Sequence, residues 1–261
     1  MHKLKFYNLK PLILISNDDG VHAKGLKALI DAVKPYGDIF VVAPEKGESG
    51  MSHAITIKNP LRVNKITEEE GLTIYSCSGT PVDSVKIALD KLIDRKPDLL
   101  LSGINHGSNA SVSVIYSGTL GAAREGCING IPSVGFSVTD HSKDADFSGA
   151  FKFVKQIVED VLENGLDKDT FLNVNVPNIS LDDIKGIRVS TQTNGVWKQE
   201  YEERQDPHGG TYYWLTGFFD NYEKGNKETD EWALDNGYVA LVPIKINSTE
   251  YSVIEKLKNR Y

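Results

Sequence analysis

Two adjacent carboxylates, Asp18 and Asp19, are the strongest chemical signal in the sequence. They follow the apolar run 12–15, whose branched residues predict a buried strand, so they stand at the carboxyl end of that strand. Doubly wound α/β folds bind their ligands at such ends. Neighbouring carboxylates repel each other unless a positive charge lies between them, and a divalent cation with oxygen ligands supplies that charge. The turn 16–20 therefore predicts a cation site, with an ordinary Asx turn as the alternative.

Three further polar loops each follow a predicted strand and carry the oxygen ligands that a hard cation prefers. Parallel strands point the same way, so we expect these loops to meet Asp18 and Asp19 at one edge of the sheet. Glycine-rich loops after strands are common, and each loop taken alone is equally consistent with a purely structural role. The loops span 43–50, 102–109 and 116–119 and include Ser49, Asn105 and Asn109.

Residues 117–119 place two hydroxyls at a predicted helix start. Free backbone N–H groups, the helix dipole and the hydroxyls of Ser117 and Thr119 together predict an anion site, where Gly118 allows close approach of the backbone. A plain serine N-cap is the alternative. A phosphate that bridges this helix start and a metal on the aspartate pair would form a phosphatase centre.

Other nucleotide-binding motifs are missing. The turn after the first strand lacks the glycine fingerprint of dinucleotide-binding folds, and the P-loop pattern is absent as well. His22, His53 and His106 fall near the proposed edge, yet none has the spacing of a metal ligand. Any of the three could protonate a leaving group, and the sequence does not choose among them.

Alternating strand and helix patterns position these residues. Apolar residues recur at helical spacing in 26–33, and Thr80 and Pro81 have the N-cap and first-turn chemistry of another helix. The pattern predicts a Rossmann-like, doubly wound, mostly parallel sheet over residues 1–178, the catalytic core. Its strands are expected at 12–15, 39–42, 99–101, 134–138 and 171–176, and its later helices at 118–127 and 147–162.

The alternation stops after Pro177, and residues 179–261 predict an antiparallel β-hairpin appendage with a terminal helix packed on the core. Strands are expected at 187–190, 211–216 and 238–244. The aromatic clusters 212–214 and 218–219 are larger than a small exposed hairpin needs, which predicts packing on the core or on another subunit.

Composition and charge limit the class of protein and the kinds of partner. The 261 residues are 40% hydrophobic and 25% charged, a balance typical of a globular protein, so the default is a soluble enzyme or a binding protein. The net charge of -7 argues against duplex nucleic acid as a partner, although a local site can still hold a small phosphorylated molecule. Lysines in 1–10 precede an apolar run too short for a signal or membrane segment, so we expect a cytoplasmic protein. Cys77 and Cys127 lack metal or disulfide spacing and are predicted to be buried thiols.

Four segments taken in order resemble the survival protein SurE family: 13–20, 79–83, 102–105 and 116–119. The similarity extends through 173–177 and 185–189. The resemblance implies one divalent metal, Mg or Mn, bound by Asp18, Asp19, Ser49 and Asn105. It also implies that Asn109, Ser117, Gly118 and Thr119 lie near the phosphate of the substrate, with Asp18 and Asp19 as the catalytic residues.

The same resemblance implies hydrolysis of nucleoside 5′- and 3′-monophosphates, trimming of short polyphosphate, and a dimer or tetramer assembled through the C-terminal hairpin, from about Gln205 to Asp230. Two loops depart from the family pattern: 45–48 lacks the usual arginines, and 106–111 lacks the usual Gly-Pro-Asn-Leu-Gly sequence. They leave base preference and polyphosphate activity open. Two alternatives stand beside this hypothesis: a two-aspartate phosphatase with an aspartyl-phosphate intermediate, and a nucleotide-binding regulator that hydrolyses nothing.

Overall fold

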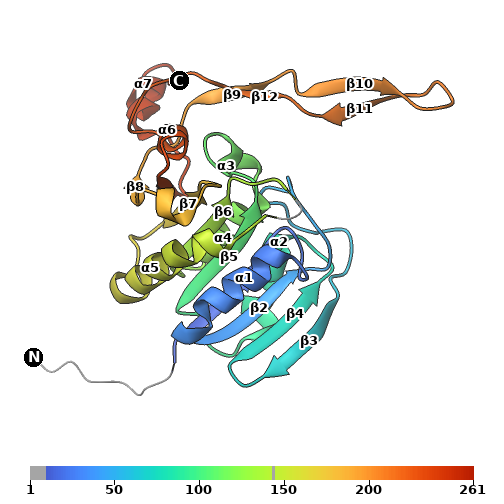
Figure 1. Cartoon of the computed structure of the whole chain (residues 1–261), viewed down its shortest axis with the longest axis vertical. Coiled ribbons are helices and arrows are strands. Elements are labelled where there is room, and N and C mark those ends of the chain that lie inside the picture. Colours follow the sequence, from blue (N-terminus) through green and yellow to red (C-terminus); the bar gives the residue numbers. More distant parts are fainter. Residues whose placement is uncertain (1–9, 143–144) are drawn as a thin grey trace, which may run out of the picture.

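A nine-stranded, mostly parallel sheet forms the centre of the computed structural model, which describes residues 10–142 and 145–261 (Figure 1). The strand order is β3-β4-β2-β1-β5-β6-β7-β13-β8. The predicted fold class, a Rossmann-like α/β sheet with an antiparallel appendage, is confirmed. The N-terminal segment on which we based the absence of a signal sequence lies, except for Lys10, outside the described residues.

The first strand has a neighbour on each side, and this determines where a ligand can bind. In β1 (Leu12–Ser16), Ile13 pairs in parallel register with Ile39 of β2 (Asp38–Pro44) and with Leu99 of β5 (Leu99–His106). The chain reaches β2 through α1 (Lys24–Val33) and later returns to the opposite side of β1. The carboxyl ends of β1 and β5 therefore form a topological switch point, where doubly wound folds bind their ligands.

Helices cover both faces of the sheet. Side chains of β1 point alternately to the two faces and pack into the apolar cluster on each. Ile13 and Ile15 join the apolar cluster under α1 and α5 (Ser148–Asn164), whereas Leu14 joins the cluster under α2 (Pro81–Ile87) and α4 (Gly118–Ile128). A strand buried on both faces explains the continuous apolar run in the sequence.

The start of α2 forms as its residues predict. Thr80 caps the helix by accepting from the Asp83 amide, Asp83 accepts from the Thr80 amide, and Pro81 occupies the first turn. The helix continues as a π-helical stretch, Ala88–Leu92. Short 3₁₀ turns occur at Lys34–Tyr36, Leu181–Asp183 and Tyr251–Val253.

The sheet extends further than the sequence indicated. A hairpin of β3 (Val63–Glu69) and β4 (Leu72–Cys77) adds one edge, with β4 parallel to β2. Beyond β6 (Ser133–Val138) and β7 (Thr170–Val176), the other edge is built by β13 (Val239–Lys245), antiparallel to β7, and β8 (Ile187–Val189), parallel to β13. The predicted catalytic core and C-terminal segment thus share one sheet, and their division at 178/179 stays a prediction.

The remaining C-terminal strands form an arm that extends away from the sheet (Figure 1). Strand β10 (Tyr201–Gln205) pairs antiparallel with β11 (Thr211–Leu215), and β9 (Gly195–Lys198) pairs antiparallel with β12 (Phe218–Asn221). Every residue of β10 and β11 is exposed, so the aromatic cluster 212–214 does not pack on the core of its own chain. The short helices of the structure are α3 (Ser113–Tyr116), α6 (Asp230–Asp235) and α7 (Ile254–Lys258).

The two cysteines and the membrane-spanning potential of the helices were also considered in the sequence. Cys77 and Cys127 are buried and free, as predicted. Across residues 10–142 and 145–261, no helix combines the length and apolarity required to cross a bilayer.

A bulge in β5 directs its last residues toward the switch point. The pairing of β5 with β6 changes register between Ser102 and Asn105. Gly103 has a positive φ of 125°, and a Cβ there would lie 2.3 Å from the carbonyl oxygen of Phe136. Only glycine fits this approach, and bulges of this kind commonly orient side chains beside active sites.

We predict that Gly103→Ala destabilises the protein by about 2 kcal/mol or more, because it adds both backbone strain and a clash with Phe136. Urea unfolding measures the change. Gly149→Ala is the matched control, because a Cβ at Gly149 meets no atom within 4 Å. Equal stability of the two variants would show that the bulge does not require glycine.

Candidate active site

The aspartate pair, the loop after β2 and the end of β5 meet at the switch point. The Glu48 amide donates to the Asp18 carbonyl oxygen at 2.7 Å. The His106 amide donates to Oδ2 of Asp19 at 3.2 Å. These contacts confirm that the loops after β2 and β5 meet the aspartate pair, as expected. Ser49 directly follows Glu48, and Asn105 directly precedes His106.

Asp18 is buried against the start of α4. Its side chain accepts a short hydrogen bond from the Thr119 hydroxyl, and a Cβ added to Gly118 would lie 2.9 Å from the Asp18 Cβ. Burial raises the pKa of Asp18 to about 6, while the Thr119 hydroxyl opposes this rise and the charge of Asp19 adds to it. The absence of a side chain at Gly118 thus lets the positive end of the helix approach a carboxylate.

Asp19 is less enclosed. Burial raises its pKa, and the backbone amide and the charge of His106 counteract this rise. Burial therefore makes both carboxyl groups resist ionisation, and at Asp18 the charge of Asp19 adds to this effect.

Ser117 caps α4 by accepting from the Leu120 amide at 3.1 Å. The side chain of Ser117 is therefore a helix N-cap, which was the alternative to an anion-binding role. An anion-binding role for the rest of the helix start stays a prediction. Thr119 is fully buried, and its hydroxyl donates to Asp18, so the residue we expected beside a phosphate contacts one of the two expected metal-binding carboxylates.

The two predicted asparagines are held in different ways. The amide nitrogen of Asn105 donates to the carbonyl oxygens of His106 and Gly107, at 3.1 and 2.9 Å, which leaves its own carbonyl oxygen as the group able to bind a cation. The amide nitrogen of Asn109 donates to the Ser137 hydroxyl at 2.8 Å. Asn109 is buried, and its role near a phosphate stays a prediction.

Oxygen atoms dominate the edge where β1 and β5 end. The buried side-chain oxygens of Ser16, Asn17 and Ser102 have no hydrogen-bond partner among the described residues. Within residues 10–142 and 145–261, no three or more His, Cys, Asp or Glu side chains are grouped so that they could bind a metal. Two carboxylates supplemented by serine and asparagine oxygens fit a hard divalent cation rather than zinc. Ser49, the fourth expected ligand, is exposed on its loop.

Comparison with known proteins shows the family of this chain. The family model described as Survival protein SurE matches residues 13–199. The chain belongs to the survival protein SurE family. It is 50% identical over 250 residues to a protein of Phocaeicola vulgatus named 5'-nucleotidase SurE, with 96% of each chain covered. A Chlorobaculum tepidum protein of the same name is 42% identical over 249 residues, covering 95% of this chain and 94% of its own.

A solved SurE structure shares the fold. The crystal structure of the SurE protein from Aquifex aeolicus superimposes with a TM-score of 0.83 at 37% identity, covering 96% of this chain and 99% of that chain. The SurE resemblance found from four short segments of sequence is therefore confirmed over nearly the whole length.

The sequence did not predict a buried asparagine network next to the candidate site. Asn175 on β7 accepts from the Asn109 amide at 2.8 Å, and Asn173 donates to the Asn109 carbonyl at 2.9 Å. Asn175 also donates to Asn173 at 2.9 Å. Two amides on an otherwise apolar buried strand were the available signal, because buried polar groups need partners.

A second missed contact comes from the C-terminal segment. Asp230, fully buried, accepts from the amide of Ser111 at 2.8 Å and from the amide of Thr193 at 3.0 Å. The loop after β5 is thus held by residues more than a hundred positions later. Local sequence patterns carry no sign of such a pairing.

The histidines occupy different places around the site. The His106 ring packs edge-on against Phe147, with centroids 4.8 Å apart, and His22 is exposed. His53 contacts Glu125. His141, which the sequence did not single out, lies over Gly107, where a Cβ would approach its ring to 2.2 Å. The choice of a proton donor for the leaving group stays open among them.

We predict that Asp18→Asn stabilises the metal-free protein at neutral pH. The folded-state pKa of about 6 exceeds the ordinary value of 3.8, so the stability that protonated Asp18 contributes is present below about pH 4 and is lost as the pH rises through 6. A tenfold change in proton affinity equals ~1.4 kcal/mol, so the advantage of the variant should grow by about 2–3 kcal/mol across this range. Urea unfolding in chelator, at several pH values, measures it.

Saturating Mn provides the control for this experiment, because bound cation should reverse the order and stabilise the wild type more than the variant. A stability difference that stays constant with pH would contradict the assigned environment of Asp18.

Proposed function

We propose that this SurE-family chain is a metal-dependent phosphomonoesterase that converts nucleoside 5′-monophosphates to nucleoside and phosphate. The observation that carries the proposal is the contact between the α4 start and the buried carboxylate of Asp18. A cation bound at Asp18 and an anion bound at this helix start would then lie side by side. The names of the relatives, 5'-nucleotidase SurE, support the same reaction.

Asp18, Asp19, Ser49 and Asn105 would hold one Mg or Mn ion. When bound, such an ion polarises a phosphate oxygen and lowers the pKa of a water molecule. The chain's contribution is to keep Asp18 in place through Thr119 and Asp19 in place through the His106 amide. Burial disfavours the ionised form of Asp18. A positive charge that compensates the buried carboxylate is therefore strongly favoured at neutral pH.

The α4 start would bind the phosphate. Ser117 caps the helix, Gly118 places no side chain over its backbone, and Asn109 is held by side chains of β6 and β7. Donors fixed before substrate arrives stabilise the charge that develops on the phosphoryl oxygens without having to reorganise. Thr119 would connect the two halves, since its hydroxyl already contacts Asp18.

Finer properties belong to the same proposal. Hydrolysis of nucleoside 3′-monophosphates, trimming of short polyphosphate and a cytoplasmic location are proposed from the family resemblance. The net charge of -7 favours small phosphorylated substrates over duplex nucleic acid.

A nucleotide panel tests the reaction. We expect phosphate release from nucleoside 5′-monophosphates with Mn or Mg, loss of release in chelator, and recovery when metal is added back. A phosphodiester such as bis-p-nitrophenyl phosphate is the control and should stay intact. Nucleotide binding without phosphate release under every metal condition would instead identify a regulator. A labelled phosphoenzyme trapped from the substrate would identify the aspartyl-phosphate alternative.

We also propose that the chain forms a homodimer or tetramer through the β10–β11 arm. Tyr213, Trp214 and Leu215 are 59%, 57% and 69% exposed on strands that do not contact the sheet of their own chain. A contiguous group of large apolar side chains is unusual on a monomer and typical of an association surface.

We predict that replacing residues 201–215 with a short glycine-serine link yields a folded monomer, because the deletion leaves the central sheet intact. Light scattering gives the mass, and circular dichroism verifies the fold. Tyr251→Ser is the control, since Tyr251 is equally exposed, at 62%, but lies outside the arm. An intact protein that is already monomeric at assay concentration would refute the proposed assembly.

A further inference from the structure

The loop that carries Ser49 continues into segment 52–56, which is hydrogen-bonded to the end of α3 and lies against α4. The Ser52 amide donates to the carbonyl of Tyr116 at 2.9 Å, and its hydroxyl donates to the carbonyl of Ile115 at 2.6 Å. Gly121 on α4 makes this approach possible, because a Cβ there would lie 2.2 Å from the Ser52 carbonyl oxygen. The loop therefore rests on the same helix that contacts Asp18.

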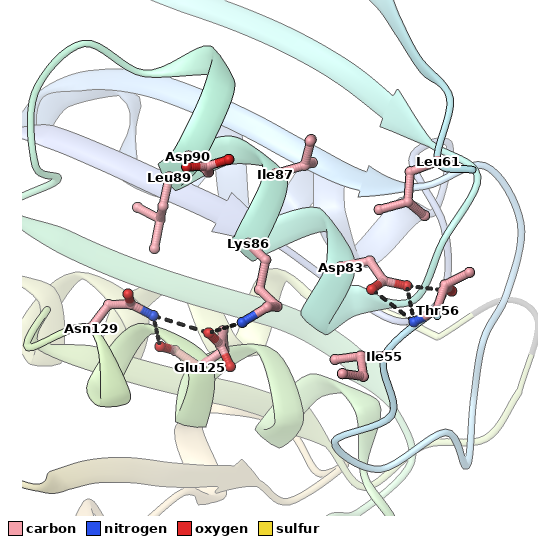
Figure 2. A pocket seen from close by; sticks show the side chains of 10 residues that line it. All are labelled: Ile55, Thr56, Leu61, Asp83, Lys86, Ile87, Leu89, Asp90, Glu125 and Asn129. Carbon is pink, nitrogen blue, oxygen red and sulfur yellow. Dashed lines mark hydrogen bonds and ion pairs between the residues drawn. The ribbon is translucent and has the colours of Figure 1, made fainter. Parts of the chain in front are cut away.

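The other end of the segment is fixed to α2. Thr56 donates to Asp83 through its amide at 3.0 Å and through its hydroxyl at 2.6 Å (Figure 2). The Thr80 hydroxyl donates to the Ala54 carbonyl at 2.7 Å. The helix-capping residues of α2 thus have a second role, which is to hold this loop.

Glu125 completes the attachment from α4. Its carboxylate is buried and lies 3.1 Å from Nε2 of His53, the second residue of the segment. Lys86 and Asn129 donate to the other carboxylate oxygen at 3.2 and 3.0 Å (Figure 2). Burial opposes ionisation of Glu125, but the contacts with these three partners outweigh it and lower the pKa of the carboxyl group. The site therefore holds a charged acceptor facing the loop.

Apolar packing does little to hold the segment. Ile55 is 50% exposed, and Ile57, the residue after the segment, is 82% exposed. A cavity of about 520 Å³ lies beside the segment, between α2 and α4, and is lined in part by Ile55, Lys86 and Glu125 (Figure 2). Segments with little buried apolar surface open locally at low cost, so polar contacts decide where this one lies.

We propose that Glu125 is a positioning residue of the active site, which acts through His53 to fix segment 52–56 and with it the loop carrying Ser49. The inference rests on the proposed function, because Ser49 is an expected metal ligand there. Helix α4 then sets the distance between two ligands: its start fixes Asp18, and its second half fixes the loop of Ser49.

Hydrogen exchange and calorimetry on full-length Glu125→Gln test the assignment. In the metal-free protein, amides of segment 52–56 should exchange faster than in the wild type. Mn affinity should fall by about tenfold or more, the usual effect of losing a group that orients a ligand. Turnover at saturating Mn should stay close to the wild-type value, a separation between metal affinity and turnover that a general loss of stability would not produce.

His53→Ala should reproduce the faster exchange in 52–56 and the loss of Mn affinity. The double variant should add little to either of these two effects, because the two residues act as one unit. If Glu125→Gln fails to fold, His53→Ala alone decides the question. Lys86→Met is the matched control: it removes another partner of Glu125 without touching the loop, so exchange in 52–56 and Mn affinity should both match the wild type.

Wild-type exchange and wild-type Mn affinity in both Glu125→Gln and His53→Ala would overturn the proposal. A wild-type protein that neither binds Mn nor releases phosphate would instead refute the proposed function. The exchange rates in 52–56 would still show whether Glu125 fixes the segment.

Discussion

The start of helix α4 lies against a buried carboxylate, and the rest of the site depends on this contact. Gly118 has no side chain to keep the helix away from Asp18, and the Thr119 hydroxyl donates to that carboxylate. A buried acid beside a second acid is costly unless positive charge compensates it. The helix start offers part of that compensation through its dipole and hydroxyl, and the oxygen-rich edge is suited to a cation that offers the rest.

The fold brings these groups together by topology and keeps them in place by long-range polar contacts. Strands β2 and β5 lie on either side of β1 and create the switch point, where doubly wound folds bind ligands. Behind it, asparagines of β7 hold the loop after β5, and Asp230 holds the same loop from the C-terminal segment. Buried polar networks hold a loop rigidly when every member has a hydrogen-bond partner.

Much of this arrangement was predictable from local patterns. Asp18 and Asp19 follow a run of apolar residues, and the Thr80 and Ser117 helix starts form as their residue types indicate. The edge strand β3 was missed because its residues are mostly polar and exposed, so it has no apolar alternation. The end of β5 was interpreted as a loop, since the bulge at Gly103 puts glycine within a strand that continues to His106. Partners such as Glu125 with His53 depend on tertiary contacts, which no local pattern encodes.

The location of a bound cation tests the central claim most directly. Anomalous diffraction from crystals grown with Mn and inorganic phosphate would give that location without relying on activity. The account predicts one strong Mn peak bound by the carboxylates of Asp18 and Asp19, with phosphate density at the start of α4. A Mn peak elsewhere in the chain, with Asp18 bonded only to Thr119, would contradict it.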